Sequence, residues 1–177
     1  MANNSTLITN RDATPKVLTD AFISGGTLSQ SYGWVFTGAS DVAGTPYRMV
    51  SVPSGARLSS LSLINTTLGN SSSIDIGVWY PTLVPTGGGA FLAASLNGTL
   101  IGSSLFKTAI LGDTLNNTPL EVMSAATTRQ QPNFQEMPLW QMIGLTSDPE
   151  CNLDLGVVVR IAVATAGYLG LKATYQY

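Results

Sequence analysis

Hydrophobic and polar residues alternate most regularly over residues 73–80. The two alternating sets of this stretch are Ile74, Ile76, Val78 and Tyr80 on one side, and Asp75, Gly77 and Trp79 on the other. A period of two over a run of this length is typical of a β-strand with one buried face. We therefore predict a half-buried strand, with Trp79 on the face opposite to the isoleucines.

Two segments upstream show the same period. Residues 57–65 place Leu61 and Leu63 opposite serines, and residues 47–52 end at a proline-serine-glycine turn. Turn-forming residues at 68–71 separate the 57–65 segment from the next strand, which indicates a hairpin. Because residues 47–52 precede this hairpin directly, the pattern predicts a three-stranded meander.

The C-terminal part of the chain repeats the alternation. Apolar residues recur at every second position over 155–163 and again over 169–175, with an alanine-glycine turn between the two runs. This arrangement predicts a second hairpin with one apolar face. Two such sets, from the two halves of the chain, predict an antiparallel β-sandwich. Its expected core residues are Ile74, Ile76, Val78, Val157, Val159, Ile161, Leu169 and Leu171.

The segments between these strands have weaker patterns. Pro138 and Gly144 bracket a short apolar run as helix start and stop signals, so we predict one short helix there, covering one end of the sandwich. Residues 81–137 are rich in proline and glycine, and their apolar run at 100–111 suits either a helix or a strand. The order of the strong elements predicts an all-β protein with one short helix.

The first 44 residues differ from the rest. They are rich in Thr, Ser, Asn and Gly and show no sustained period, although they contain Phe22, Tyr32, Trp34 and Phe36. We interpret residues 1–44 as an extended N-terminal arm with a strand near Trp34, and residues 45–177 as the β-sandwich domain.

The composition favours a protein that packs against partners. Charged residues make up 10% of the 177 residues, against roughly 25% in a typical soluble domain. A surface with so few charges does little to prevent association, so we predict a homodimer or homotrimer. The eight Lys and Arg residues are scattered and the net charge is −2, which argues against nucleic acid as a partner. Apolar runs are shorter than the roughly 20 residues of a transmembrane helix, and no secretory signal is visible, so no membrane partner is expected.

Residue types suited to catalysis are few. The sequence has no histidine, which is the commonest general base and metal-binding imidazole. The single cysteine, Cys151, has Asp148, Glu150 and Asp154 as neighbours, and these acids are expected to raise the pKa of the thiol rather than activate it. Residues 147–154 also offer oxygen ligands for a hard cation, but a capped turn explains them more simply. We predict no catalytic site, no cofactor and no metal site.

Aromatic side chains are the remaining candidates for a functional surface. Trp79 either packs internally or lies at a subunit interface, and internal packing is the favoured alternative. Tyr32, Trp34 and Phe36 have the spacing of one strand face, which more often faces a core, but their position in a polar arm favours contact with a partner. The predicted interface residues are Phe22, Tyr32, Trp34, Phe36 and Trp79.

Four segments, taken in order, resemble the capsid decoration (cement) proteins of tailed bacteriophages. They are residues 47–57, 74–80, 139–149 and 166–175. The resemblance implies a jelly-roll or related β-sandwich that binds the outside of a shell of major capsid protein. None of the four segments is a chemical signature, so the resemblance depends on their order.

Composition and resemblance together predict a non-enzymatic virion protein. It is expected to be made in the host cytoplasm, to bind the major capsid protein on the capsid exterior and to stabilise the head through many weak, repeated contacts. The alternatives are another head-completion, tail or fibre protein, and a carbohydrate-binding β-sandwich module. In the carbohydrate-binding alternative, an exposed Trp34 or Trp79 would stack on a sugar.

Overall fold

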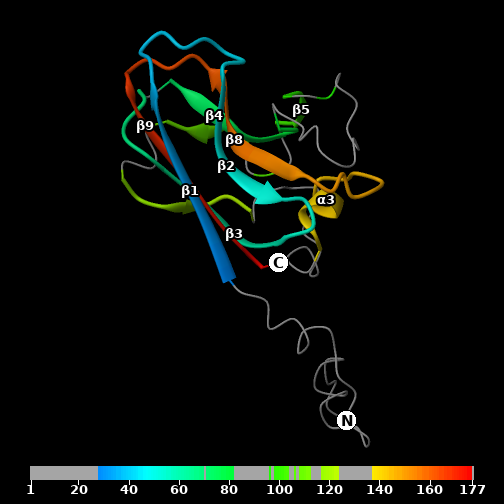
Figure 1. Cartoon of the computed structure of the whole chain (residues 1–177). Helices are drawn as coiled ribbons and strands as arrows, with labels where there is room; N and C mark the ends of the chain where they lie inside the picture. Colours follow the sequence, from blue (N-terminus) through cyan, green and yellow to red (C-terminus); the bar gives the residue numbers. More distant parts are fainter. Residues whose placement is uncertain are drawn as a thin grey trace, which may run out of the picture.

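Two antiparallel β-sheets pack face to face in the computed structural model (Figure 1). The structure describes residues 28–69, 71–81, 96, 98–103, 106, 108–112, 117–123 and 137–176. The first sheet has the strand order β1 (Leu28–Thr37), β9 (Gly167–Gln176), β3 (Arg57–Asn65) and β7 (Leu120–Glu121). The second sheet has the order β2 (Pro46–Pro53), β8 (Asn152–Ile161), β4 (Ser73–Trp79) and β5 (Leu100–Gly102), with β6 (Ile110–Leu111) also paired to β4.

Strands β1 to β4 alternate between the two sheets, and so do β7, β8 and β9, which is the winding of a jelly roll. Strands β1, β3 and β9 belong to the first sheet, whereas β2, β4 and β8 belong to the second. The predicted all-β, jelly-roll-like sandwich is therefore confirmed. The predicted meander and both hairpins are wrong, because β3 pairs with β9 and β4 pairs with β8. Alternation reports only which side of a strand is apolar, and a strand can bury that side by facing the other sheet.

The core lies between the sheets and contains seven of the eight predicted residues, each at most 1% exposed. The exception is Ile161, which is 50% exposed. Strand β8 pairs regularly with β4 as far as Val159, but the register then shifts between Ser73 and Ile74. A bulge of this kind turns the following side chain to the opposite face. The placement of Ile161 in the core is therefore wrong.

Strand β4 is buried on both faces, so the prediction of a half-buried strand is also wrong. On its outer face, the Asp75 carboxylate accepts a hydrogen bond from the backbone N–H of Ala109 at 2.7 Å and lies 3.6 Å from the Arg160 guanidinium. Trp79 is 3% exposed and folds over Gly77 on the same face. A central strand that is covered by a later loop needs partners for its polar groups, and Asp75 has them.

Strand β1 is an integral edge strand of the first sheet. All ten of its residues pair with β9. Its inner side rests on β2 so closely that a Cβ atom at Gly33 would lie 1.9 Å from the Met49 carbonyl oxygen. The predicted boundary at residue 44 therefore assigns to the arm a strand that belongs to the sandwich. The rest of the predicted arm, residues 1–27 with Phe22, lies outside the described residues.

The short helix is confirmed as α3 (Leu139–Met142), which begins after Pro138. Its first backbone N–H groups bond to the turn between β2 and β3: Leu139 N–H to the Ala56 carbonyl at 2.7 Å, and Trp140 N–H to the Ser54 carbonyl at 3.0 Å. Gly144 then reverses the chain with a φ of 83°. The helix thus lies at one end of the sandwich, beside the end of β2 (Figure 1). Within the described part of the chain, no helix has the length and apolar character needed to cross a membrane.

Candidate functional site

Four exposed aromatic side chains gather on the outer face of the first sheet. Alternation along β1 turns Tyr32, Trp34 and Phe36 outward, and they are 60%, 65% and 54% exposed. Tyr168 at the start of β9 is 51% exposed and stands opposite Phe36 in the strand pairing. The ring of Tyr168 lies 5.0 Å from the ring of Phe36 and 5.7 Å from that of Trp34, both at tilted angles that aromatic pairs prefer. We call these four residues the aromatic face.

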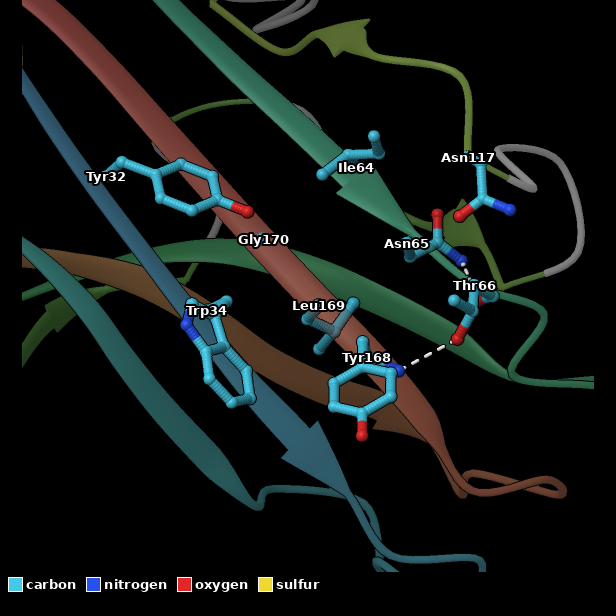
Figure 2. Close-up of a pocket in the computed structure, with 9 residues that line it drawn as sticks. All are labelled: Tyr32, Trp34, Ile64, Asn65, Thr66, Asn117, Tyr168, Leu169 and Gly170. Atoms are coloured by element: carbon cyan, nitrogen blue, oxygen red, sulfur yellow. Dashed lines mark hydrogen bonds between the residues drawn. The ribbon is translucent and has the colours of Figure 1, made fainter.

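A groove of about 460 Å³ lies beside the aromatic face (Figure 2). Its floor is Gly170 of β9, which pairs with Trp34 on one side and with Ile64 on the other. A Cβ atom at this position would lie 2.9 Å from both Ile64 Cγ2 and the Tyr32 hydroxyl. The absence of a side chain at Gly170 therefore creates the depth of the groove. The lining residues are Tyr32, Trp34, Ile64, Asn65, Thr66, Asn117, Tyr168, Leu169 and Gly170.

The wall of the groove opposite Trp34 is polar. Asn65 ends β3 and is held by its Nδ2, which donates to the carbonyl oxygens of Thr66 and Gly112 at 2.7 Å each. The Thr66 hydroxyl accepts a hydrogen bond from the Tyr168 backbone N–H at 2.8 Å, which ties the polar wall to the aromatic one (Figure 2). The Asn117 backbone N–H bonds to the Asn65 carbonyl at 2.8 Å. The wall is therefore fixed by the fold.

The structure brings together three of the predicted interface residues, Tyr32, Trp34 and Phe36. Trp79 does not lie with them. Its side chain is 3% exposed and packs within the protein, which is the alternative that the sequence favoured. Phe22 lies outside the described residues. Sequence reasoning missed Tyr168 and Gly170. The alternation over residues 169–175 places Gly170 on the polar side, and extending it back by one period places Tyr168 there too, which was the available signal for Tyr168.

The predicted absence of an activated cysteine agrees with the surroundings of Cys151. The pKa of the Cys151 thiol is raised from 9.0 to about 11, mainly by burial and in smaller part by the charges of Asp148 and Asp154. The Asp148 carboxylate accepts hydrogen bonds from the Ser54 hydroxyl and from the Glu150 backbone N–H, as expected for a capped turn. This part of the molecule is arranged for structure and not for nucleophilic attack.

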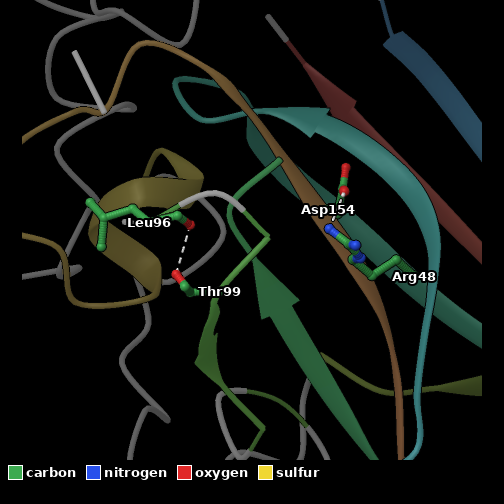
Figure 3. A network of polar contacts seen from close by, with 4 residues as sticks. All are labelled: Arg48, Leu96, Thr99 and Asp154. Carbon is green, nitrogen blue, oxygen red and sulfur yellow. Dashed lines mark hydrogen bonds and ion pairs between the residues drawn. The ribbon is translucent and has the colours of Figure 1, made fainter. Parts of the chain in front are cut away.

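Polar contacts near the outer strands of the second sheet also hold the chain in place (Figure 3). Arg48 of β2 lies 3.7 Å from the Asp154 carboxylate of β8, and burial raises the pKa of that carboxyl. The Thr99 hydroxyl donates to the Leu96 carbonyl at 2.8 Å, which closes a turn before β5. Both interactions link neighbouring parts of the second sheet and its loops.

A second exposed apolar surface lies on the opposite side of the sandwich. Leu111 of β6 and Ile161 of β8 both pair with Ser73 of β4, and they are 53% and 50% exposed. Ser73 between them is 2% exposed, and its hydroxyl oxygen has no hydrogen-bond partner among the described residues. We call these three residues the strand-end patch. The patch therefore consists of two large, exposed apolar side chains on either side of a buried serine hydroxyl.

The topology and the two surfaces define a jelly-roll sandwich with one hollowed aromatic face and one exposed apolar patch. No protein-family model matches the sequence, and neither does any curated protein. A chain of the capsid of Ralstonia phage GP4 is similar in structure, with a TM-score of 0.54 over 85% of this chain and 84% of that chain at 16% identity. A chain of the cyanophage Pam1 capsid asymmetric unit has a TM-score of 0.50 over 86% of each chain at 15% identity. At these identities the likeness establishes a shared fold.

Proposed function

We propose that this chain is a structural protein of a bacteriophage capsid, and specifically a decoration protein that binds the shell of major capsid protein and stabilises the head. The observation that carries the proposal is the extent of the likeness: nearly the whole jelly roll corresponds to chains from two phage capsid structures. The order of the four sequence segments supports the same class independently of the fold.

The surface chemistry suits a protein that works through repeated contacts. Only 10% of the residues are charged, and large apolar side chains are exposed on both outer faces of the sandwich. A weak apolar contact repeated over a symmetric shell gives a large total stabilisation. We assign the contact with capsid neighbours, or with a second copy, to the strand-end patch, because two large apolar side chains are exposed there on either side of Ser73. Tyr32, Trp34 and Phe36 are the alternative contact residues.

Purification of assembled phage heads tests the proposal. We expect the chain to remain with the heads at a fixed, high ratio to the major capsid protein, and heads that lack it to break at lower temperature. A ratio of only a few copies per particle would favour a head-completion, tail or fibre protein instead. Recovery of the chain only in the fraction without particles would show that the proposal is wrong.

A further inference from the structure

The groove beside the aromatic face combines two kinds of wall. One wall consists of exposed aromatic rings, Trp34 and Tyr168, with Tyr32 at its end, and the facing wall consists of Asn65, Thr66 and Asn117. None of the nine lining residues carries a charge. A volume of about 460 Å³ lies within the range of about 300–1,000 Å³ that is usual for small-ligand sites.

We propose that this groove binds a ring of an uncharged saccharide. A sugar ring has a face of C–H groups, which packs on an aromatic ring, and a rim of hydroxyls, which exchange hydrogen bonds with amides and hydroxyls. An anionic ligand would have no cationic side chain to pair with in the lining. A purely apolar ligand would displace water from the polar wall without replacing the hydrogen bonds that the water made. The neutral, two-sided lining therefore selects a ligand that is apolar on one face and polar at its edge. The inference is independent of the proposed place of the protein in a capsid.

The site is formed before any ligand arrives. The Asn65 amide is held by two hydrogen bonds, and the bond between Thr66 and Tyr168 fixes the distance between the walls. Ring contacts with Trp34 and Phe36 restrict Tyr168 further. The Asn65 Oδ1 atom is buried under the polar wall and has no hydrogen-bond partner among the described residues. Rigid walls reduce the entropy that a ligand loses on binding, and a bridging water can satisfy the buried Asn65 acceptor.

Gly170 limits the size of the ligand, because it supplies the floor. A Cβ atom here would meet side chains and no backbone, with Ile64 Cγ2 and the Tyr32 hydroxyl both at 2.9 Å. A larger residue at position 170 therefore needs a shift of the Ile64 and Tyr32 side chains but no shift of the backbone. Gly170→Val is thus a variant that fills the groove and keeps Trp34 and Tyr168.

The experiment is a glycan array of neutral hexose and N-acetylhexosamine oligosaccharides, followed by calorimetric titration of the strongest hit. We expect at least a tenfold loss of affinity in Gly170→Val and in Trp34→Ala. Leu28→Ala is the matched control, since Leu28 is a 55% exposed apolar residue on the same face of β1 but outside the groove, and its affinity should be unchanged. Ligand should also protect Trp34, the exposed tryptophan, from acrylamide quenching.

Other results of these experiments would contradict the saccharide proposal. If the folded protein binds no glycan on the array, or if Trp34→Ala binds as tightly as the parent, the proposal is wrong. If Gly170→Val and Trp34→Ala instead abolish binding to phage heads while no glycan binds, the groove is a contact with capsid protein. Thermal melting of each variant verifies folding. Should Gly170→Val fail to fold, Trp34→Ala and Tyr168→Ala decide the question.

Discussion

The indole of Trp79 lies directly over Gly77, two residues earlier on strand β4, so closely that a Cβ atom at Gly77 would lie 2.7 Å from Trp79 Cη2. Both residues belong to the outer face of the second sheet, and Trp79 is 3% exposed there. The glycine therefore provides the space in which the largest side chain of the strand is buried.

Replacing this glycine should destabilise the fold. We expect Gly77→Ala to lower the free energy of unfolding by about 1–3 kcal/mol, because the indole must leave its position in a packed region. Urea denaturation measures the loss. Trp79→Leu in the Gly77→Ala background should recover part of it, since the shorter side chain no longer meets the added methyl group. Strictly additive effects of the two substitutions would contradict this packing.

Strand β8 contains a buried and an exposed aliphatic residue only two positions apart, and they should respond differently to a charge. Val159→Asp places an unpaired carboxylate in the core, where Val159 is 1% exposed, and should cost more than about 4 kcal/mol or prevent folding. Ile161→Asp is the matched control, because Ile161 is 50% exposed and should change the melting temperature little. Equal destabilisation by both substitutions would show that the bulge after Val159 is absent.

This pair also shows what alternation can and cannot predict. The period of two identified the buried faces of β3, β4, β8 and β9, because a side chain in a regular strand must face one side or the other. Ile161 was misplaced because a bulge depends on the pairing with β4 and leaves no trace in the period. Asp75 lies on the face of residues 73–80 that alternation predicts to be exposed, but a segment without a readable pattern covers this face near Ala109.

The strand partners and the groove were harder still to predict. Residues 57–65 and 73–80 look like a hairpin in sequence, yet each pairs with a strand from the C-terminal part of the chain, which local turn chemistry cannot reveal. The groove needs Trp34, Ile64 and Gly170 in one row across three strands. That row exists only once β9 lies between β1 and β3, so the sequence could identify Trp34 as an aromatic candidate but could not assemble the groove around it.

Stability should fall at high pH. The pKa of Cys151 is raised to about 11, mainly by burial, and that of Tyr47 is raised to about 12 by burial and by its hydrogen bond to Asp41. Both groups are therefore more easily ionised in the unfolded chain. Their contribution is fully present below pH 9 and is lost as the pH rises toward 12. Urea midpoints between pH 7 and 11 should show this fall.

Two variants separate these groups from general alkaline effects. In the Tyr47→Phe, Cys151→Ala double variant, the urea midpoint should fall less between pH 9 and 11 than in the parent. The same raised pKa predicts slow modification of Cys151 by iodoacetamide at pH 8, compared with the thiol of the urea-unfolded chain. Rapid modification of the folded protein at pH 8 would show that the thiol is activated after all.

The strand-end patch should control association without affecting the fold. Leu111 and Ile161 are exposed on the second sheet, so Leu111→Asp and Ile161→Asp should melt within a few degrees of the parent. If the patch contacts capsid neighbours or a second copy, each substitution introduces a charge into an apolar contact and should release the chain from heads or dissociate its oligomer. Sedimentation and head pelleting measure the two effects. Unchanged binding in both variants would move the contact to the aromatic face.

The last prediction concerns the N-terminal segment, whose boundary with the sandwich is corrected by β1. Because the strand begins at Leu28 and pairs with β9 over its whole length, deletion of residues 1–27 retains every described contact and should leave a cooperative thermal transition. Deletion of residues 1–37 also removes β1, exposes the edge of β9 and uncovers β2, so this variant should aggregate. We propose that the part of the predicted arm before β1 lies across a neighbouring subunit or the shell, so the shorter deletion should also weaken head binding. Loss of the cooperative transition in the shorter deletion would contradict the hypothesis, because those residues would then be part of the sandwich itself.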